Sequence, residues 1–266
     1  MTARRVAALL ACLIVTVIAL PAAAQRPAPA SVPDGADAAR ARTLLTRMGE
    51  HLGAAQKFSV AIDAAYDVSQ SSGQKVEFGA VRRLLLSRPD KLRIELEQRD
   101  GRKELVLFDG ANMTMFTAKE NVFARVAKPG TIDQIIHYLV DDLQTPLPLS
   151  VMLLTTLAQD LDRRVTEVAL VDEETVGGRA VDHVAARTAE VDFQVWITRG
   201  EQPVPVRIVI SYKQAAGQPQ FSATLAEWNF NPTFEPSAFV FAPPAGATPV
   251  AFMIPAPARA PPSGKR

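Results

Sequence analysis

Residues 76–116 read VEFGAVRRLLLSRPDKLRIELEQRDGRKELVLFDGANMTMF and carry the strongest strand pattern in the chain. Apolar and polar residues alternate within it, as in residues 92–96 (LRIEL). Turn-forming pairs at residues 89–90 (PD), 100–101 (DG) and 109–110 (DG) separate the alternating runs. Alternation at period two with Asp-Gly between the runs is typical of antiparallel hairpins. The stretch therefore predicts a meander of strands to which the rest of the chain is added.

Outside this stretch the apolar pattern predicts further strands and three helices. Apolar residues at helical spacing indicate helices at residues 37–52, 129–144 and 149–161, and Thr131 is a suitable N-cap for the second. Alternation at period two indicates strands elsewhere. These strands are expected at residues 58–68, 121–126, 165–171, 180–186, 191–198, 204–212, 221–230 and, as a short terminal strand, 236–241.

The order of these elements predicts an α+β fold built on one large antiparallel sheet. We expect about 11 strands, curved into an open half-barrel, because regularly spaced hairpins favour one strongly twisted sheet. The helices are too few to form a second layer of equal size. The helix that begins at residue 132 carries an apolar stripe, and the helix at residues 149–161 is apolar around much of its circumference. We therefore expect both to plug the concave face as a lid. The N-terminal helix precedes the sheet.

The two ends of the chain have the composition of targeting and linker segments. Arg4 and Arg5 precede an apolar run at residues 6–20, and an Ala-x-Ala site ends at Ala24, so we predict a signal peptide over residues 1–24, cleaved after Ala24. An uncleaved membrane anchor and lipidation at Cys12 are the alternatives. After cleavage no cysteine and no transmembrane span remain. Residues 25–36 read as a Pro/Ala-rich linker, residues 37–247 as the domain and residues 248–266 as a disordered tail.

The composition and the motifs argue against several classes of function. With 29 Lys and Arg against 28 Asp and Glu, the net charge is +1, and no basic stripe predicts nucleic-acid binding. The chain lacks a Gly-x-Ser-x-Gly motif, and its carboxylate pairs lie on the polar parity of strands. His137 and Asp141 have a spacing that suits a metal, but two residues fit a solvated helix end better. We therefore predict no enzyme, no catalytic residue, no metal and no cofactor.

Three short motifs, in this order, resemble the periplasmic lipoprotein-carrier superfamily, which includes LolA, LolB and LppX. They are residues 87–93 (SRPDKLR), 107–110 (LFDG) and 239–246 (FVFAPPAG). The chain looks most similar to a predicted periplasmic family, domain of unknown function 2092. The resemblance implies a periplasmic protein with an open half-barrel, a helical lid and an apolar cavity for acyl chains. It also implies that Arg88, in the Arg-Pro turn, anchors the lid; a solvated arginine at a strand end is the alternative.

The resulting hypothesis is a periplasmic protein that holds a lipid, an acyl chain or another hydrophobic ligand, with a role in lipid or lipoprotein trafficking implied by the resemblance. The alternative is an envelope protein-interaction or sensor domain with a filled core, for which Trp196 and Trp228 would form an outer contact patch. The inner wall is mainly aliphatic. The predicted cavity wall is Val60, Ile62, Phe78, Leu84, Leu92, Ile94, Phe193, Val195, Ile208 and Leu225. The predicted lid contacts are Ile135, Ile136, Leu139, Met152, Leu153 and Leu157.

Overall fold

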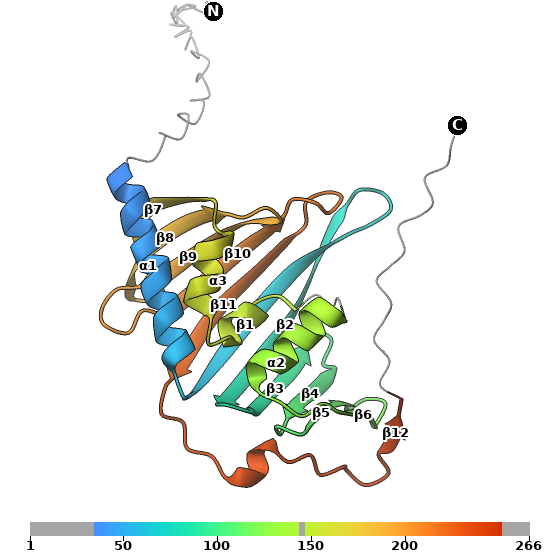
Figure 1. Cartoon of the computed structure of the whole chain (residues 1–266). Coiled ribbons are helices and arrows are strands. Elements are labelled where there is room, and N and C mark those ends of the chain that lie inside the picture. The colour runs from blue at the N-terminus through green and yellow to red at the C-terminus, as the bar shows by residue number, and fades with distance from the viewer. Residues whose placement is uncertain (1–34, 144–146, 252–266) are drawn as a thin grey trace, which may run out of the picture. The chain divides into compact units, whose positions relative to one another are not determined.

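A twelve-stranded sheet forms the framework of the part that the computed structural model describes, residues 35–143 and 147–251 (Figure 1). Six strands precede the lid and six follow it along the chain. The strands are β1 (Lys57–Ser69), β2 (Lys75–Ser87), β3 (Lys91–Gln98), β4 (Lys103–Phe108), β5 (Asn112–Thr117), β6 (Val122–Ala127), β7 (Glu167–Val176), β8 (Arg179–Arg187), β9 (Val191–Thr198), β10 (Pro205–Tyr212), β11 (Gln220–Asn229) and β12 (Thr248–Val250).

The sheet is open and joins two meanders at its centre. Its order is β12-β6-β5-β4-β3-β2-β1-β11-β10-β9-β8-β7, so β12 and β7 are the edges. Strand β1 pairs with its hairpin neighbour β2 and, on its other side, with β11. Every pairing is antiparallel except that of β12 with β6. The predicted α+β class with one large antiparallel sheet is confirmed.

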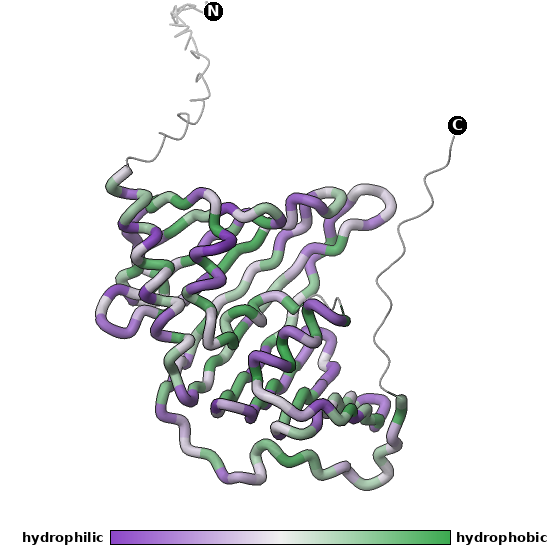
Figure 2. The backbone as a smooth tube through the Cα atoms, in the orientation of Figure 1, coloured by the Kyte–Doolittle hydropathy of each residue, from purple (hydrophilic) through white to green (hydrophobic). Residues whose placement is uncertain are grey.

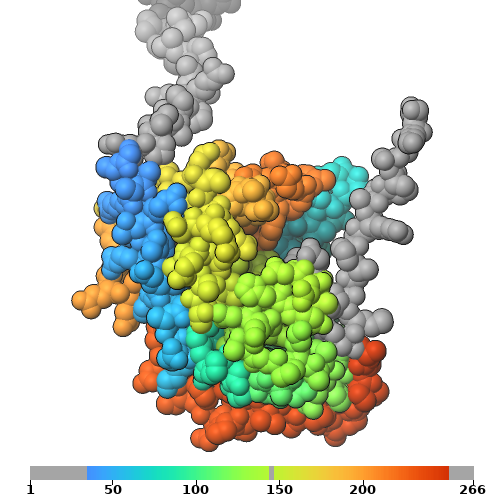
Figure 3. All heavy atoms as spheres, in the orientation of Figure 1, coloured from blue at the N-terminus to red at the C-terminus, as the bar shows by residue number. Residues whose placement is uncertain are grey.

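Helices cover one face of this sheet (Figures 1 and 3). Helix α1 spans Gly35–Ala54, α2 spans Ile132–His137 and continues as a π turn at Tyr138–Asp142, and α3 spans Leu157–Arg164. Between them lies a 3-10 helix, Ser150–Leu153. We call the set from Ile132 to Arg164, without residues 144–146, the lid. In Figure 3 α1, α3 and α2 lie next to one another across this face.

The start of α2 agrees with its sequence signal. The side chain of Thr131 accepts a hydrogen bond from the backbone N–H of Gln134, 3.3 Å away, and the Gln134 side chain accepts one from the Thr131 backbone at 2.9 Å. This reciprocal capping box satisfies two N–H groups that the first helical turn leaves free. The predicted N-cap at Thr131 is confirmed, and the lid therefore begins at a fixed point beside the sheet.

The predicted continuous helix over residues 149–161 is wrong, because it is broken between Leu153 and Leu157. In a continuous helix the Leu153 carbonyl would accept from the N–H four residues later. Here that carbonyl accepts from the Arg88 guanidinium at 2.9 Å, and the Thr155 N–H donates to the Asp133 carboxylate at 3.2 Å. Distant side chains thus replace the backbone bonds that would continue the helix.

The C-terminal part also departs from the predicted pattern. Residues Pro236–Phe239 form a 3-10 helix instead of the expected terminal strand. The last strand comes later, where Thr248, Pro249 and Val250 pair in parallel with β6, so residues 248–250 are not the start of a disordered tail. The rest of the predicted tail, the signal peptide with its cleavage site, Cys12 and most of the linker lie outside the described residues. The described part of the chain contains no helix long and apolar enough to cross a membrane.

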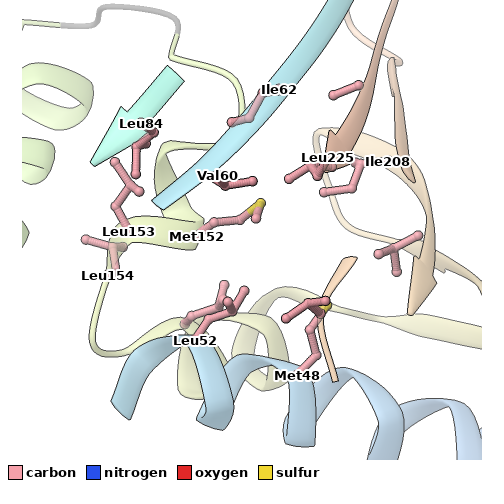
Figure 4. Close-up of a cluster of buried hydrophobic side chains, with 14 of the residues drawn as sticks. Met48, Leu52, Val60, Ile62, Leu84, Met152, Leu153, Leu154, Ile208 and Leu225 are labelled. Atoms are coloured by element: carbon pink, nitrogen blue, oxygen red, sulfur yellow. The ribbon is translucent and has the colours of Figure 1, made fainter. Parts of the chain in front are cut away.

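The core lies between the sheet and the helices, because alternate residues of each strand point toward the lid. Figure 2 shows this alternation of apolar and polar residues along the strands. In β1 the buried residues are Phe58, Val60, Ile62 and Ala64, all of one parity. Helix α1 contributes Met48 and Leu52, which face the sheet in Figure 4. Apolar burial of this kind is the main favourable term for folding.

A bulge in β11 overturns the predicted tryptophan patch. Two residue steps on β1 face three on β11, where Glu227 has a φ of +55°. One extra residue moves the following side chains to the opposite face, and Trp228 packs against the core. Trp196 does face outward, but it is only 8% exposed, because the His183 ring stacks on it at 3.9 Å. The two tryptophans do not form one exposed surface.

Candidate functional site

Two cavities lie between the sheet and the lid, one on each side of Met152. Cavity A, of about 360 Å³, lies between α2 and strands β1 to β5. Cavity B, of about 300 Å³, lies between α3 and strands β9 and β10. Leu149 and Met152 line both, so this short segment of the lid divides the space into two parts. In Figure 4 Met152 extends between Val60 of the sheet and Leu52 of α1.

The structure brings most of the predicted wall and lid residues to these cavities. Strand parity selected the wall residues, because alternate residues of a strand share a face, and helical spacing selected the lid residues. From the predicted set, cavity A is lined by Val60, Ile62, Leu84, Leu92, Ile94, Ile135, Ile136, Leu139, Met152 and Leu153. Cavity B is lined by Phe193, Val195, Ile208, Leu157 and again Met152.

Two predicted wall residues line neither cavity. Phe78 has the same parity as Leu84, but it lies near the far end of β2, where it is 46% exposed and stacks on Tyr66 with 6.1 Å between ring centroids. The helices do not reach this end of the hairpin (Figure 1). Leu225 is 2% exposed and is ordinary core. Neither is therefore a candidate ligand contact.

Several cavity residues are absent from the predicted set. Val106 and Met115 follow Ile94 across the register of β3, β4 and β5, so strand pairing brings them to cavity A. The sequence could have predicted both positions, because the turns of a hairpin fix which residues of its strands pair. Arg82 is two residues before Leu84 and shares its parity, but its charge led to its omission. Glu104 also lines cavity A.

Arg88 contacts the lid at Asp133 and Leu153, and its side chain is only 5% exposed. Its guanidinium donates to three backbone carbonyls: Nε to Ala55 at 3.0 Å, Nη1 to Leu153 at 2.9 Å and Nη2 to Leu52 at 3.5 Å. Burial lowers the pKa of this guanidinium, and the nearby Asp133 carboxylate opposes the shift. A buried cation requires such partners, and here they come from the last turn of α1, from Ala55 just after it and from the 3-10 helix of the lid.

Asp133 completes the connection from α2. Its carboxylate lies 3.6 Å from Arg88 Nη1 and accepts hydrogen bonds from the backbone N–H and the hydroxyl of Thr155. The backbone N–H of Ile132 also donates to the Pro89 carbonyl at 2.8 Å. The turn that follows β2 therefore contacts α1, α2 and the break between the 3-10 helix and α3. This arrangement holds the lid by a few polar contacts beside the two apolar cavities.

A family model described as "Predicted periplasmic protein (DUF2092)" matches residues 41–253. The chain belongs to this family. The predicted membership in domain of unknown function 2092 is thus confirmed, and the family is described as periplasmic. The match extends from α1 to the end of the described sheet, so it includes the lid and both cavities. No curated protein matches the chain.

Three solved structures have folds similar to that of this DUF2092 protein. An uncharacterised conserved protein from Thermus thermophilus is 10% identical, with a TM-score of 0.46 over 80% of this chain and 99% of its own. LprF from Mycobacterium bovis is 13% identical, with a TM-score of 0.47 over 73% and 95%. A LolA superfamily protein from Nitrosomonas europaea is 10% identical, with a TM-score of 0.36 over 76% and 97%.

Proposed function

We propose that this DUF2092 protein is a periplasmic binding protein that holds an acyl chain or another hydrophobic ligand between the sheet and the lid. The observation that carries the proposal is the pair of cavities, of about 360 and 300 Å³, that remain between two apolar layers. Ligand sites in proteins commonly have volumes of about 300–1,000 Å³ and mainly apolar walls. A densely packed core leaves few spaces larger than a water molecule.

The chemistry of the walls favours an aliphatic ligand. Cavity A is lined mainly by Val, Ile, Leu, Met and Phe side chains. Burial of an acyl chain against such a surface contributes about 25 cal/mol for each Å² removed from water. The same burial also has to offset the loss of freedom on association. A long chain is thus favoured over a short one, because each methylene adds burial while most of the association cost is already met.

In this proposal Arg88 acts as the anchor of the lid. The lid contacts the sheet mainly through apolar side chains, and these contacts can be exchanged for contacts with a ligand. The hydrogen bonds of Arg88 and Asp133 keep the root of the lid in place while its apolar part rearranges. The predicted signal peptide, cleaved after Ala24, would deliver the domain of residues 37–247 to the periplasm. A role in lipid or lipoprotein trafficking would follow from such a ligand.

The test is to purify the exported protein from the periplasm and look for co-purified lipid by native mass spectrometry. Uptake of a fluorescent acyl probe is then compared between the wild type and I94W, in which the larger side chain fills cavity A. V81W is the matched control, because Val81 is 40% exposed and lines neither cavity. We expect I94W to lose probe uptake and V81W to retain it. Absence of both lipid and probe uptake in the wild type would refute the proposal.

That negative outcome would favour the alternative, a protein-interaction or sensor domain with a permanently packed lid. The two functions make opposite predictions for I94W. Under ligand binding, a side chain that fills cavity A competes with the ligand. Under the alternative, filling the same space improves packing and raises stability without loss of partner binding. Probe uptake therefore separates the two: uptake by the wild type and V81W but not by I94W supports ligand binding, whereas no uptake by the wild type together with a more stable I94W favours the alternative.

A further inference from the structure

Arg82 lies within β2 and Arg88 directly follows the last residue of that strand, but their surroundings differ sharply. Every nitrogen of the Arg88 guanidinium donates to a backbone carbonyl. The Arg82 side chain lines cavity A, and its guanidinium makes no hydrogen bond or ion pair with the described residues. A guanidinium carries five N–H donors and stays protonated in proteins. Arg82 thus presents an unused cation to a mainly apolar space.

The neighbours of Arg82 in the sheet explain why no carboxylate of the protein pairs with its guanidinium. Its register partners are Ile62 on β1 and Leu96 on β3. Glu104 lies beyond Leu96 on β4, so two strand spacings, about 10 Å, separate its backbone from that of Arg82. The Glu104 carboxylate instead accepts a hydrogen bond from the Gln98 side chain at 3.2 Å. Burial lowers the pKa of Arg82, and Tyr66 and Glu104 oppose this shift.

We propose that Arg82 binds the anionic head of a single-chain amphiphile whose acyl chain occupies cavity A. The inference rests on the proposed ligand-binding function and names its substrate class: a long aliphatic chain that ends in a carboxylate or a phosphate. Both heads are oxyacids that match the planar fork of a guanidinium. The site is partly dehydrated, which strengthens a contact between opposite charges.

The geometry of the cavity agrees with this orientation of the ligand. Strand β1 runs from Val60 past Ile62 and Ala64 to Tyr66, and β2 runs alongside it from Leu84 past Arg82 and Ala80 to Phe78. Leu84 and Val60 lie under the lid, whereas Tyr66 and Phe78 are 37% and 46% exposed. Arg82 therefore marks the point where the apolar cavity gives way to the solvent-exposed end of the hairpin. An amphiphile would place its chain beneath the lid and its head at this boundary.

The test compares ligands that share one chain and differ in the head. Hexadecanol, palmitate and hexadecyl phosphate compete with a neutral fluorescent acyl probe for the wild type, R82Q, R82K and R83Q. R83Q is the matched control, because it removes the same charge from the next position of β2. The Arg83 side chain faces outward and is 67% exposed. Thermal unfolding of each variant checks that the protein is folded.

We expect the wild type to bind the anionic ligands more tightly than hexadecanol, and R82Q to weaken anion binding about tenfold or more while leaving hexadecanol unchanged. R82K should retain part of the preference, and R83Q all of it. The ratio of palmitate to hexadecyl phosphate in the wild type then distinguishes a carboxylate from a phosphate ligand. Equal binding of all three ligands by the wild type, or an unchanged preference in R82Q, overturns the inference but leaves the proposed function standing. Failure of the probe and all three ligands to bind overturns the proposed function itself.

Discussion

The Nη1 of Arg88 donates to the backbone carbonyl of Leu153 across 2.9 Å, although 65 positions separate the two residues in sequence. Arg88 directly follows β2, whose last residue is Ser87, and Leu153 ends the 3-10 helix of the lid. The bond uses a carbonyl that a regular helix would have used for itself. The bond therefore joins the lid to the end of β2, and it occupies the carbonyl at the break between the 3-10 helix and α3.

Replacement of Arg88 by leucine should loosen the lid. The carbonyls of Leu52, Ala55 and Leu153 would lose their donor, and buried polar groups without partners are unfavourable. We expect the free energy of unfolding to fall by about 3 kcal/mol, as measured by urea denaturation. Uptake of a fluorescent acyl probe should become faster, because the lid would open more often.

The control for this change is Arg83→Leu on β2, the strand that Arg88 follows. Arg83 is exposed and lies 3.8 Å from Glu227, and exposed ion pairs contribute at most about 1 kcal/mol. This variant should keep the stability and the uptake rate of the wild type. If Arg88→Leu also leaves both unchanged, the Arg-Pro turn has no role in the lid.

Removal of the Asp133 carboxylate should free the break in the lid. In Asp133→Ala the N–H and hydroxyl of Thr155 lose their acceptor, and Arg88 loses its nearby charge. We expect a loss of about 1–3 kcal/mol, together with faster amide hydrogen exchange at Thr155. Exchange at Ile62, in the centre of the sheet, should change less, because local opening of the lid does not require the sheet to unfold.

The exposed Asp142, in the π turn that follows α2, provides a matched carboxylate. Asp142→Ala removes the same charge from the lid but leaves the contact with Thr155 intact. In Asp142→Ala the rate of hydrogen exchange at the Thr155 amide should equal that of the wild type. An equal acceleration in both variants would show that charge on the lid, and not the bond to Thr155, controls the opening.

Local patterns predicted the hairpins and most of the cavity wall. The Asp-Gly turns set the pairing of β3, β4 and β5, and the parity of β1 placed Val60 and Ile62 inward. These features depend on residues that are close in sequence, so they can be read from a single chain. The N-cap at Thr131 belongs to the same class, because its partner Gln134 is three residues away.

The features that the sequence did not reveal depend on distant contacts. The bulge at Glu227 appears only where β11 pairs with β1, and it alone decides that Trp228 faces the core. The break in the lid depends on Arg88 and Asp133, which lie far from Leu153 and Thr155 in sequence. Arg82 was missed for another reason: parity placed it inward, but an unpaired charge is not expected to line an apolar cavity.

Acid should destabilise the turn between β4 and β5 through Asp109. Burial raises the pKa of this carboxyl, but hydrogen bonds from the backbone N–H groups of Asn112 and Ala111, at 2.6 and 2.9 Å, outweigh it and bring the pKa below its ordinary value. A carboxyl whose pKa is lower in the folded state stabilises above its unfolded pKa, and this contribution is lost as the pH falls through the folded value. The wild type should therefore lose stability below about pH 4.

The neutral variant Asp109→Asn should depend less steeply on pH over that range, because it has no charge to lose there. Urea denaturation at several pH values between about 2 and 6 measures the difference. Glu201→Gln, at an exposed loop position, serves as the control and should follow the wild type. Parallel curves for the wild type and Asp109→Asn would exclude a role for this carboxyl in the acid response.

Truncation of Met152 should join the two cavities. The side chain is 8% exposed and lines both spaces, so Met152→Ala removes part of the wall between them. We expect the free energy of unfolding to fall by about 2–5 kcal/mol, as for other large-to-small substitutions in protein cores. The preference among saturated fatty acids should shift toward longer chains, because one chain can then extend from cavity A into cavity B.

Leu154→Ala separates this effect from a simple loss of stability. Leu154 is as deeply buried, at 3% exposure, but it lines neither cavity. Its truncation should therefore destabilise the protein to a similar extent and leave the chain-length preference of the wild type in place. Competition of fatty acids of increasing length with the acyl probe gives the comparison. A shift in both variants would mean that a weakened core, and not the wall formed by Met152, limits the length of chain that is bound.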